Sequence, residues 1–274
     1  MLTEENAVLA SWAGYFGMGL ALILFCVPML TFKKILAEGN VLGFDGLPYV
    51  FSLLNCGLWV IYALPSVTPG RMQPEIINAI GMVLEFMYCV LYAVYAPGKA
   101  FQKEFGCSVV FLVILFIIVH SFEDTHQASP ILGVIASILN IIMYASPLSV
   151  MKKVWYSQSV EFMPLHLSLA TFFCSFSWFV YGALLGDGAI LFCNICGVFL
   201  GLVQLGLYYR VSQYPDLSLI NLDKISSNSA VNLDQYSQLP GSDDALGAEG
   251  DLNLPKIDEN IDNFGVNQDD FDAI

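Results

Sequence analysis

Charged residues are scarce in this sequence. Only 12% of the 274 residues are Asp, Glu, Lys or Arg, whereas 57% are hydrophobic and the mean hydropathy is +0.67. A soluble domain is only about 45–50% apolar. The excess lies in long runs such as AGYFGMGLALILFCVPML and CSVVFLVILFIIV, and a helix of about 20 apolar residues spans a bilayer. The composition excludes an ordinary soluble protein and predicts an all-α membrane protein with several spans.

The sequence also lacks the residue groups that metal sites, disulfide frameworks and enzymes need. None of its seven cysteines belongs to a CxxC pair that precedes a matching Cys or His pair, so they indicate small buried thiols. The histidines, His120, His126 and His166, lie at span ends or in loops without a nucleophile or metal cluster. We therefore expect no enzyme, no metal and no cofactor. No basic segment precedes the first apolar run, so we expect an uncleaved anchor there.

Turn and charge signals divide the apolar sequence into seven predicted spans. These are residues 12–32, 46–64, 74–96, 106–122, 129–151, 164–185 and 189–209. Among the basic residues up to position 210, Arg71 alone falls on one side of this arrangement. The seven on the other side are Lys33, Lys34, Lys99, Lys103, Lys152, Lys153 and Arg210. By the positive-inside rule those seven face the cytosol, which predicts an extracellular N-terminus and a cytosolic C-terminus.

Negative charge is concentrated in the last part of the chain. Residues 211–274 hold 13 acidic residues and two lysines, so they contribute −11 to the formal net charge of −14. Low hydropathy and the absence of a sustained apolar period predict an acidic, disordered cytosolic tail over this range. It is either a solvated terminus or a segment that binds a partner or a trafficking factor.

Short phrases recur along the chain at nearly constant offsets. The matches are PMLTFKK (28–34) with PLSVMKK (147–153), Trp59 with Trp178 and Tyr62 with Tyr181, all 119 positions apart, and Asn78 with Asn194 and Gly81 with Gly197, 116 positions apart. The repeat unit is therefore a three-helix bundle, 12–96 in the first copy and 129–210 in the second, with 106–122 as a linker helix. Because the linker adds one crossing, both copies start on the same side. This predicts two parallel repeats in a 3+1+3 arrangement, with a substrate site at their interface.

These segments resemble the SWEET sugar transporters, also called the MtN3/saliva family. The resemblance covers about residues 12–210 and is carried by PMLTFKK, LPYVFSLLNCGLWVIYA, INAIGMVLEFMY, SPLSVMKK, SVEFMPLHLSL, SWFVYG and CNICGVFLGLVQ. The family is itself one of the examples from which the parallel-repeat plan is known. The resemblance implies a uniporter that moves sugar by alternating access and works as a homo-oligomer, a trimer or a dimer.

Two repeat-related pairs of prolines stand toward the predicted cytosolic side. Pro28 and Pro147 lie within spans, whereas Pro48 and Pro164 open spans. Proline removes a backbone donor and kinks a helix, which membrane helices tolerate when neighbours satisfy the freed groups. An ordinary helix start remains an alternative for the second pair. The resemblance implies that all four form a hinge and cytosolic gate.

Each half also places a tryptophan one turn after a small or polar residue. Trp59 follows Asn55 and Trp178 follows Cys174 at a spacing of four, so each pair shares a helix face. A sugar needs both kinds of surface, because its C–H faces pack on aromatic rings and its hydroxyls need hydrogen bonds. The alternative is anchoring at the membrane interface. The resemblance implies that these residues flank a sugar pocket.

Asn78 and Asn194 are uncharged polar residues inside predicted spans. A carboxamide offers two donors and an acceptor, and leaving it unpaired in hydrocarbon costs about 1–3 kcal/mol. Such a pair suits a neutral polar substrate better than an ion. Hydrogen bonding between helices is the alternative. The resemblance implies that the two asparagines bind sugar.

Three further residues lie near the path. The resemblance implies that Tyr62 and Asp187 form an extracellular gate, and a solvated loop aspartate is the alternative. Glu85 lies near the middle of the third span and has Gly201 in its place in the other half. An intramembrane acid can signal proton coupling, but an unrepeated one favours a hydrogen-bonded structural role. We therefore expect uniport rather than ion-coupled transport.

The sequence thus predicts facilitated diffusion of a hexose such as glucose. That preference comes from the likeness of SWFVYG and GVFLGLVQL to glucose-type family members, and a sucrose-preferring member is the alternative. A seven-helix receptor would share the number of helices, but it would not contain the internal repeat. We expect the plasma membrane, with the vacuolar membrane as the alternative, and only sugar, lipid and further copies of the chain as partners, with no nucleic acid.

Overall fold

The computed structural model describes residues 4–213, which fold almost entirely into helices. Residues 1–3 and 214–274 lie outside this part, and with them nearly all of the predicted acidic tail. The elements are α1 (Glu4–Cys26), α2 (Pro28–Glu38), α3 (Leu47–Ala63), α4 (Met72–Tyr95), α5 (Ala100–His120), the short 3₁₀ helix η1 (Thr125–Ala128), α6 (Ser129–Met143), α7 (Ala145–Ser157), α8 (Leu165–Leu185) and α9 (Gly188–Ser212).

These elements form seven apolar helical segments, in agreement with the number of predicted spans. The α1–α2 pair and the α6–α7 pair each form one long segment with a break, and α4, α5, α8 and α9 are single long helices. Each of these six is long and apolar enough to cross a membrane, and α3, with 17 residues, is a shorter apolar helix. The first segment starts at residue 4 rather than 12, and the segment predicted at 129–151 runs on to residue 157.

Both helix breaks lie beside a proline, where the sequence predicts kinks. α1 gives way to α2 at Val27, directly before Pro28, and α6 gives way to α7 at Tyr144, three residues before Pro147. Proline has no N–H, so the helical hydrogen-bond ladder cannot pass through it. At each break the amide bonds three residues back instead of four: Val27 to Leu24 O at 3.2 Å and Tyr144 to Ile141 O at 3.0 Å.

The other two prolines stand at helix starts. Pro48 is the second residue of α3, and Pro164 is the N-cap residue of α8. The first helical turn has no intrahelical partner for its N–H groups, so proline costs no hydrogen bond there. The four prolines therefore occupy two kinds of position, one of each kind in each half of the sequence.

The helices pack in two matching sets. In the first set α4 packs against α1, α2 and α3, and in the second set α9 packs against α6, α7 and α8. The sets meet where α1 packs against α8 and α3 against α6, which are again equivalent pairs under the repeat. α5 packs against α3 and α4, so it is attached to the first set. The exact domain boundaries, 12–96, 106–122 and 129–210, remain predictions.

Small residues let α1 approach α8 closely. A Cβ atom added at Gly14 would lie 3.0 Å from the Tyr181 ring, and one added at Gly17 would lie 3.0 Å from the Trp178 ring. Glycine at helix crossings allows this kind of close packing within membranes. The two sets are therefore in direct contact next to the tryptophan of the second half.

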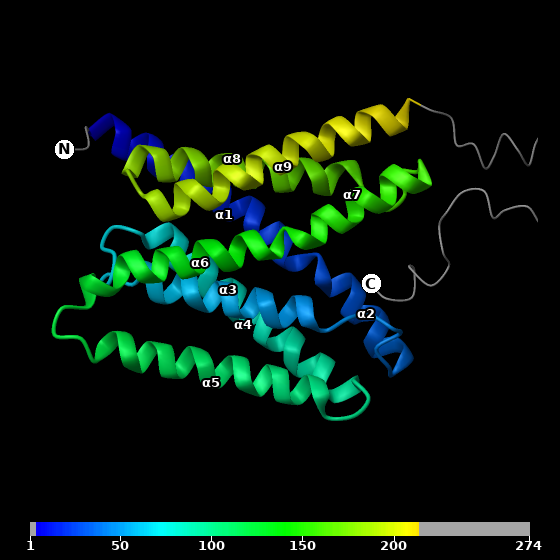
Figure 1. Ribbon diagram of the computed structural model, residues 1–274, viewed down its shortest axis with the longest axis horizontal. Helices are drawn as coiled ribbons and strands as arrows, with labels where there is room; N and C mark the ends of the chain where they lie inside the picture. The colour runs from blue at the N-terminus through cyan, green and yellow to red at the C-terminus, as the bar shows by residue number, and fades with distance from the viewer. Residues whose placement is uncertain (1–3, 214–274) are drawn as a thin grey trace, which may run out of the picture. The chain divides into compact units, whose positions relative to one another are not determined.

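The two ends of the helices differ. In Figure 1, α2 and α7 diverge at one end, whereas the short connections α3–α4, α5–α6 and α8–α9 gather at the other. The diverging helices carry the lysine pairs Lys33–Lys34 and Lys152–Lys153. Arg71 immediately precedes α4, at the opposite end. We call these the open end and the loop end.

We predict that Gly182→Ala destabilises the second set. A Cβ at this position of α8 would lie 2.8 Å from the backbone nitrogen of Leu191 on α9, which cannot rotate away. Overpacking of this kind costs about 1–3 kcal/mol, so the melting temperature of the detergent-solubilised protein should fall. Gly19→Ala on α1 is the control, because a Cβ there meets nothing within 4 Å. Equal melting temperatures for the two variants would contradict the predicted clash.

Candidate functional site

A central cavity of about 110 Å³ lies between the two sets of helices. Its lining comprises Asn55 and Trp59 of α3, Pro74 and Asn78 of α4, Asn140 of α6, Trp178 of α8, and Ile190, Cys193 and Asn194 of α9. Five of the six residues predicted to bind substrate are among them. The sixth, Cys174, is buried outside the lining, with its thiol 3.8 Å from the Gly17 carbonyl of α1.

The sequence did not point to Pro74, Asn140, Ile190 and Cys193 as lining residues. Asn140 carried a usable signal, because it is a carboxamide within an apolar span, and the same argument had selected Asn78 and Asn194. It has no counterpart in the first half, where Ala21 stands 119 positions earlier. A search guided by the repeat therefore passes over it.

The paired asparagines present oxygens to the cavity. The Nδ2 atom of Asn78 donates to the Pro74 carbonyl at 2.9 Å, and that of Asn194 donates to the Ile190 carbonyl at 2.8 Å. These matching bonds fix both carboxamides and leave their Oδ1 acceptors available. The Oδ1 atom of Asn55 is buried and has no hydrogen-bond partner among the described residues. The cavity is therefore rich in acceptors, which suits a ligand that brings its own O–H donors.

The two tryptophans have matching surroundings. Trp59 meets Tyr62 edge to face with ring centroids 5.4 Å apart, and Trp178 meets Tyr181 in the same way at 5.4 Å. Edge-to-face contacts of this kind hold aromatic rings in a defined orientation. Each half thus offers one oriented indole ring to the cavity.

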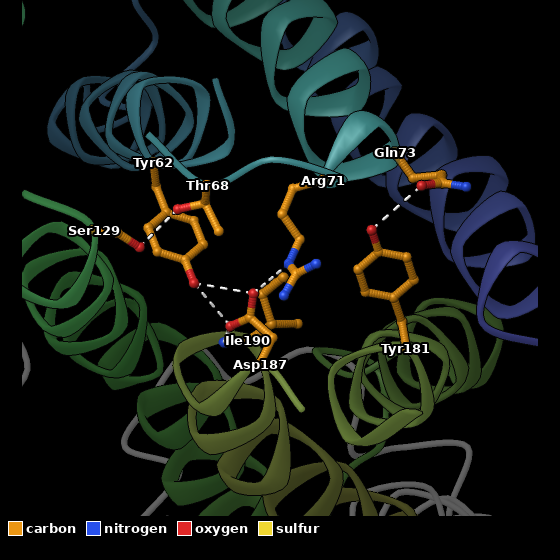
Figure 2. Close-up of polar contacts among 8 residues, drawn as sticks. All are labelled: Tyr62, Thr68, Arg71, Gln73, Ser129, Tyr181, Asp187 and Ile190. Atoms are coloured by element: carbon orange, nitrogen blue, oxygen red, sulfur yellow. Dashed lines mark hydrogen bonds and ion pairs between the residues drawn. The ribbon is translucent and has the colours of Figure 1, made fainter. Parts of the chain in front are cut away.

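Polar side chains join the two sets at the loop end (Figure 2). The Tyr62 hydroxyl lies 2.9 Å from both carboxylate oxygens of Asp187, and the Nε atom of Arg71 donates to Oδ2 at 2.6 Å. Asp187 also accepts a hydrogen bond from the Ile190 amide at 3.1 Å, as the N-cap of α9. Its side chain is only 1% exposed and that of Arg71 is 15% exposed. This ion pair joins the two sets at the loop end.

Arg71 and Asp187 occupy equivalent positions in the two repeats. They are 116 residues apart, the same offset that relates the paired asparagines, and they are the N-cap residues of α4 and α9. Each therefore meets its own counterpart across the interface. The sequence suggested a Tyr62–Asp187 contact but did not point to the arginine.

Two further contacts reinforce the loop end. The Tyr181 hydroxyl of α8 donates to Gln73 Oε1 of α4 at 3.3 Å, and the hydroxyls of Thr68 and Ser129 lie 2.7 Å apart (Figure 2). Both contacts cross from the first half of the sequence to the second. The loop end is thus held at several points around the ion pair.

The open end is arranged differently. Pro48 and Pro164 are exposed at its helix starts, and Pro28 and Pro147 are half-buried beside the breaks. α2 packs against α4 of its own set, and α7 packs against α6 and α9 of its own set. The two sets are bonded to each other by side chains at the loop end, whereas α2 and α7 at the open end pack within their own sets. The four prolines lie toward the open end.

Glu85 lies apart from the cavity. It is 3% exposed on α4, and its Oε2 atom has no hydrogen-bond partner in the described part of the chain. The Ser52 hydroxyl of α3 interacts with the same carboxyl group. Within residues 4–213, no group of three or more His, Cys, Asp or Glu side chains is suited to hold a metal ion.

A second, larger hollow of about 380 Å³ lies between α6 and α9. Its lining is mostly apolar and includes Val134, Ile138 and Phe192, each more than half exposed on the outer helix surfaces. Such a hollow offers few polar partners to a ligand. The central cavity is the better candidate site, because there polar and aromatic groups from both halves converge.

Comparison with known proteins agrees with this geometry. A family described as "Sugar efflux transporter for intercellular exchange" matches residues 11–100 and 130–216. The chain belongs to this family. Among its relatives is the rice (Oryza sativa subsp. japonica) protein named bidirectional sugar transporter SWEET1a, 42% identical over 198 residues, or 71% of this chain and 72% of that protein. Another is the Arabidopsis thaliana bidirectional sugar transporter SWEET1, 40% identical over 200 residues, or 72% of this chain and 81% of that protein.

The fold is also similar to that of a solved structure. The chain is similar to a structure of a eukaryotic SWEET transporter with a TM-score of 0.72 and 39% sequence identity, covering 77% of this chain and all of the other. The predicted family and the predicted all-α, seven-helix membrane fold are confirmed. The chain is accordingly a multi-pass membrane protein of the SWEET family.

We predict that Arg71→Gln destabilises this SWEET-family protein, because it leaves Asp187 buried without its cation. Removing one partner of a buried ion pair costs about 3–5 kcal/mol, and the melting temperature in detergent should fall accordingly. The double variant Arg71→Gln/Asp187→Asn should recover part of that loss, since no unpaired charge remains. Lys33→Gln is the control for removal of an exposed cation. A double variant that melts below Arg71→Gln would refute this account of the ion pair.

Proposed function

We propose that this protein moves sugar across a membrane by facilitated diffusion, through alternating access to the central cavity. One observation carries the proposal: a cavity between two matching helix sets is lined by paired tryptophans and asparagines and closed at one end by an ion pair. Membership of the sugar transporter family supports it. In a parallel-repeat transporter, the substrate site lies at the interface of the repeats.

The chemistry of the cavity fits a neutral polyhydroxy compound. The Oδ1 atoms of Asn55, Asn78 and Asn194 serve as acceptors for sugar hydroxyls, and Trp59 and Trp178 pack against the C–H faces of the ring. No charged side chain belongs to the lining. Hydrogen bonds to well-placed acceptors, combined with aromatic packing, hold a neutral ligand without an ionic contact.

A hexose such as glucose fits best. The cavity of about 110 Å³ is small beside the roughly 300–1,000 Å³ of pockets for drug-sized ligands, which favours a single sugar ring over a disaccharide. Each half supplies two carboxamides to the lining, but Asn55 and Asn140 are not at equivalent repeat positions, so the two halves contact the sugar differently. A preference for sucrose is the alternative.

The two ends of the path serve as alternating gates. Tyr62, Asp187 and Arg71 form the extracellular gate, which is closed in this conformation. The prolines Pro28, Pro48, Pro147 and Pro164 form the hinge and cytosolic gate. Helices broken at proline can bend there at low cost, since the ladder hydrogen bond is already missing. Opening the outer end requires the ion pair to separate, and bending at the breaks brings the inner end together.

Transport is downhill and uncoupled to ions. The cavity lacks a charged residue, and Glu85 lies outside its lining. Its partner position in the second half is Gly201, so no repeated ion site is formed. Glu85 then has a structural role in the first set, and the protein acts as a transporter without enzymatic activity or cofactor.

The diverging end faces the cytosol. Seven cations lie at that end of the sequence pattern, and Arg71 lies at the other. By the positive-inside rule the N-terminus is then extracellular and the C-terminus cytosolic. We propose the plasma membrane as the location, with the vacuolar membrane as the alternative, and a homo-oligomer, a trimer or a dimer, as the working form.

We predict that purified protein in liposomes exchanges labelled glucose by saturable counterflow, and that Asn78→Ala, Asn194→Ala and Trp178→Ala each slow it by at least about fivefold. Each change removes a contact worth about 1–3 kcal/mol, and 1.36 kcal/mol corresponds to tenfold. Trp12→Ala is the matched control, because Trp12 lies on α1 and is 69% exposed. A pH gradient should leave the rate unchanged.

The results separate the alternatives. Counterflow of sucrose without glucose would replace the proposed substrate, and flux that follows the pH gradient would make Glu85 a coupling residue. If no sugar shows saturable flux, the transport proposal is wrong and a seven-helix receptor is favoured. Equal loss of activity in Trp12→Ala and Trp178→Ala would remove the cavity from the mechanism.

We predict that glucose 6-phosphate competes at least about tenfold more weakly than glucose for labelled glucose counterflow. The phosphate dianion would find no cationic side chain in the cavity lining, and burying an unpaired charge is costly. The compound 6-deoxyglucose is the control, since it lacks the same hydroxyl but carries no charge and should still compete. Equal competition by glucose 6-phosphate and glucose would contradict the acceptor-lined cavity.

A further inference from the structure

The break between α6 and α7 is bonded directly to the helix that carries Asn194. Tyr144, the residue at the break, donates its hydroxyl to the Cys193 carbonyl of α9 at 3.0 Å. In a helix that carbonyl also accepts from the amide of Gly197, and its second lone pair is available to the tyrosine. Cys193 lines the central cavity. The bond therefore ends one residue from a proposed sugar-binding carboxamide.

Packing around this bond leaves little freedom. A Cβ atom added at Gly197 would lie 2.5 Å from the Tyr144 hydroxyl oxygen, so only glycine leaves room for it. Asn140 stands one turn before Tyr144 on the same face of α6, and its side chain interacts with the Cys193 thiol. Two consecutive turns of α6 thus contact α9 at the wall of the cavity.

The first half repeats the packing but not the bond. Phe25 stands 119 positions before Tyr144, and Gly81 stands 116 positions before Gly197. A Cβ at Gly81 would lie 2.6 Å from Phe25 Cζ, so a ring again lies on a glycine at the break. Phenylalanine has no hydroxyl. The residue at the Cys193 position is Ile77, and it receives no bond from the ring.

A different tyrosine anchors the first break. The Tyr88 hydroxyl of α4 donates to the Phe25 carbonyl at 3.0 Å, which satisfies a carbonyl freed at the proline kink. Tyr88 is ten residues beyond Asn78, or about 15 Å along the helix at 1.5 Å per residue. The first break is therefore fixed far from its asparagine, whereas the second is fixed beside its own.

We infer that Tyr144 is a positioning residue that couples sugar bound at Asn194 to bending at the α6–α7 break. This inference rests on the proposed function. The break is the two-state element, because Pro147 has removed a ladder bond and α7 can swing about it. A sugar hydroxyl on Asn194 fixes the α9 backbone at Cys193, and the tyrosine bond passes that constraint to the pivot. The second half then carries the sugar-dependent part of the motion.

The coupling has a kinetic signature. Exchange measures reorientation of the sugar-loaded protein in both directions, whereas net efflux into sugar-free medium includes the return of the empty protein. If bound sugar drives the hinge, wild-type protein in liposomes should exchange labelled glucose faster than it releases it. We predict that Tyr144→Phe slows exchange about three- to tenfold, the effect of one lost hydrogen bond, and changes net efflux less than about twofold. The ratio of the two rates falls toward one.

Matched variants separate this role from general damage. Tyr209→Phe makes the same chemical change on α9 at a side chain that is 69% exposed, and Tyr88→Phe removes the anchor of the first break. Both should keep the wild-type ratio. Gly197→Ala displaces the tyrosine hydroxyl and should lower the ratio, whereas Gly81→Ala crowds a ring without a hydroxyl and should not. Because a ratio of rates is compared, loss of folded protein cancels.

Each outcome has one meaning. A lowered ratio in Tyr144→Phe and Gly197→Ala, with the wild-type ratio in the three controls, supports the coupling. An unaltered ratio in Tyr144→Phe, or an equal fall of the ratio in Tyr88→Phe, overturns it while the proposed transport stands. Absence of saturable glucose flux in wild-type liposomes overturns the proposed function, and the coupling falls with it.

Discussion

The ion pair between Arg71 and Asp187 is the contact on which the arrangement of the two helix sets depends. Both residues are helix N-caps at equivalent repeat positions, and they meet where the two copies face each other. One copy supplies the cation and the other the anion, so equivalent positions of the two repeats carry opposite charges and pair with each other. Tyr62 adds a hydrogen bond to the same carboxylate. These side chains hold the starts of α4 and α9 together, close to the cavity-lining residues Pro74 and Ile190.

At the other end the governing constraint is the backbone in a membrane, where freed polar groups need partners. The breaks beside Pro28 and Pro147 release such groups, and a tyrosine hydroxyl lies at each break. In the first half Tyr88 of α4 donates its hydroxyl to a carbonyl at the break. In the second half Tyr144, which lies at the break, donates its hydroxyl to a carbonyl of α9. Only the first bond satisfies a carbonyl at a break, because the Tyr144 hydroxyl donates to the Cys193 carbonyl within α9. This difference gives two similar halves unlike connections to the cavity.

Much of this architecture could be predicted from the sequence, because duplication marks positions twice. Trp59, Trp178, Asn78 and Asn194 stand out by their common offsets, and all four line the cavity. Offsets identify equivalent positions but not which side chains meet across the interface, so the role of Arg71 in the ion pair was missed. Residues without a repeat counterpart are harder to predict as lining residues, and Asn140 was not predicted to line the cavity. Cys174 shares a helix face with Trp178, yet close packing of α1 turns its thiol toward a glycine carbonyl instead of the cavity.

The absence of charge from the cavity lining has an electrical consequence. Moving one elementary charge through a potential of 100 mV involves about 2.3 kcal/mol, which would bias a charged cargo nearly fiftyfold toward one side. A neutral cargo held by carboxamides and indole rings carries no such bias. Its equilibrium distribution then depends on concentration alone, so a change in membrane potential would not change the amount of this solute inside the cell.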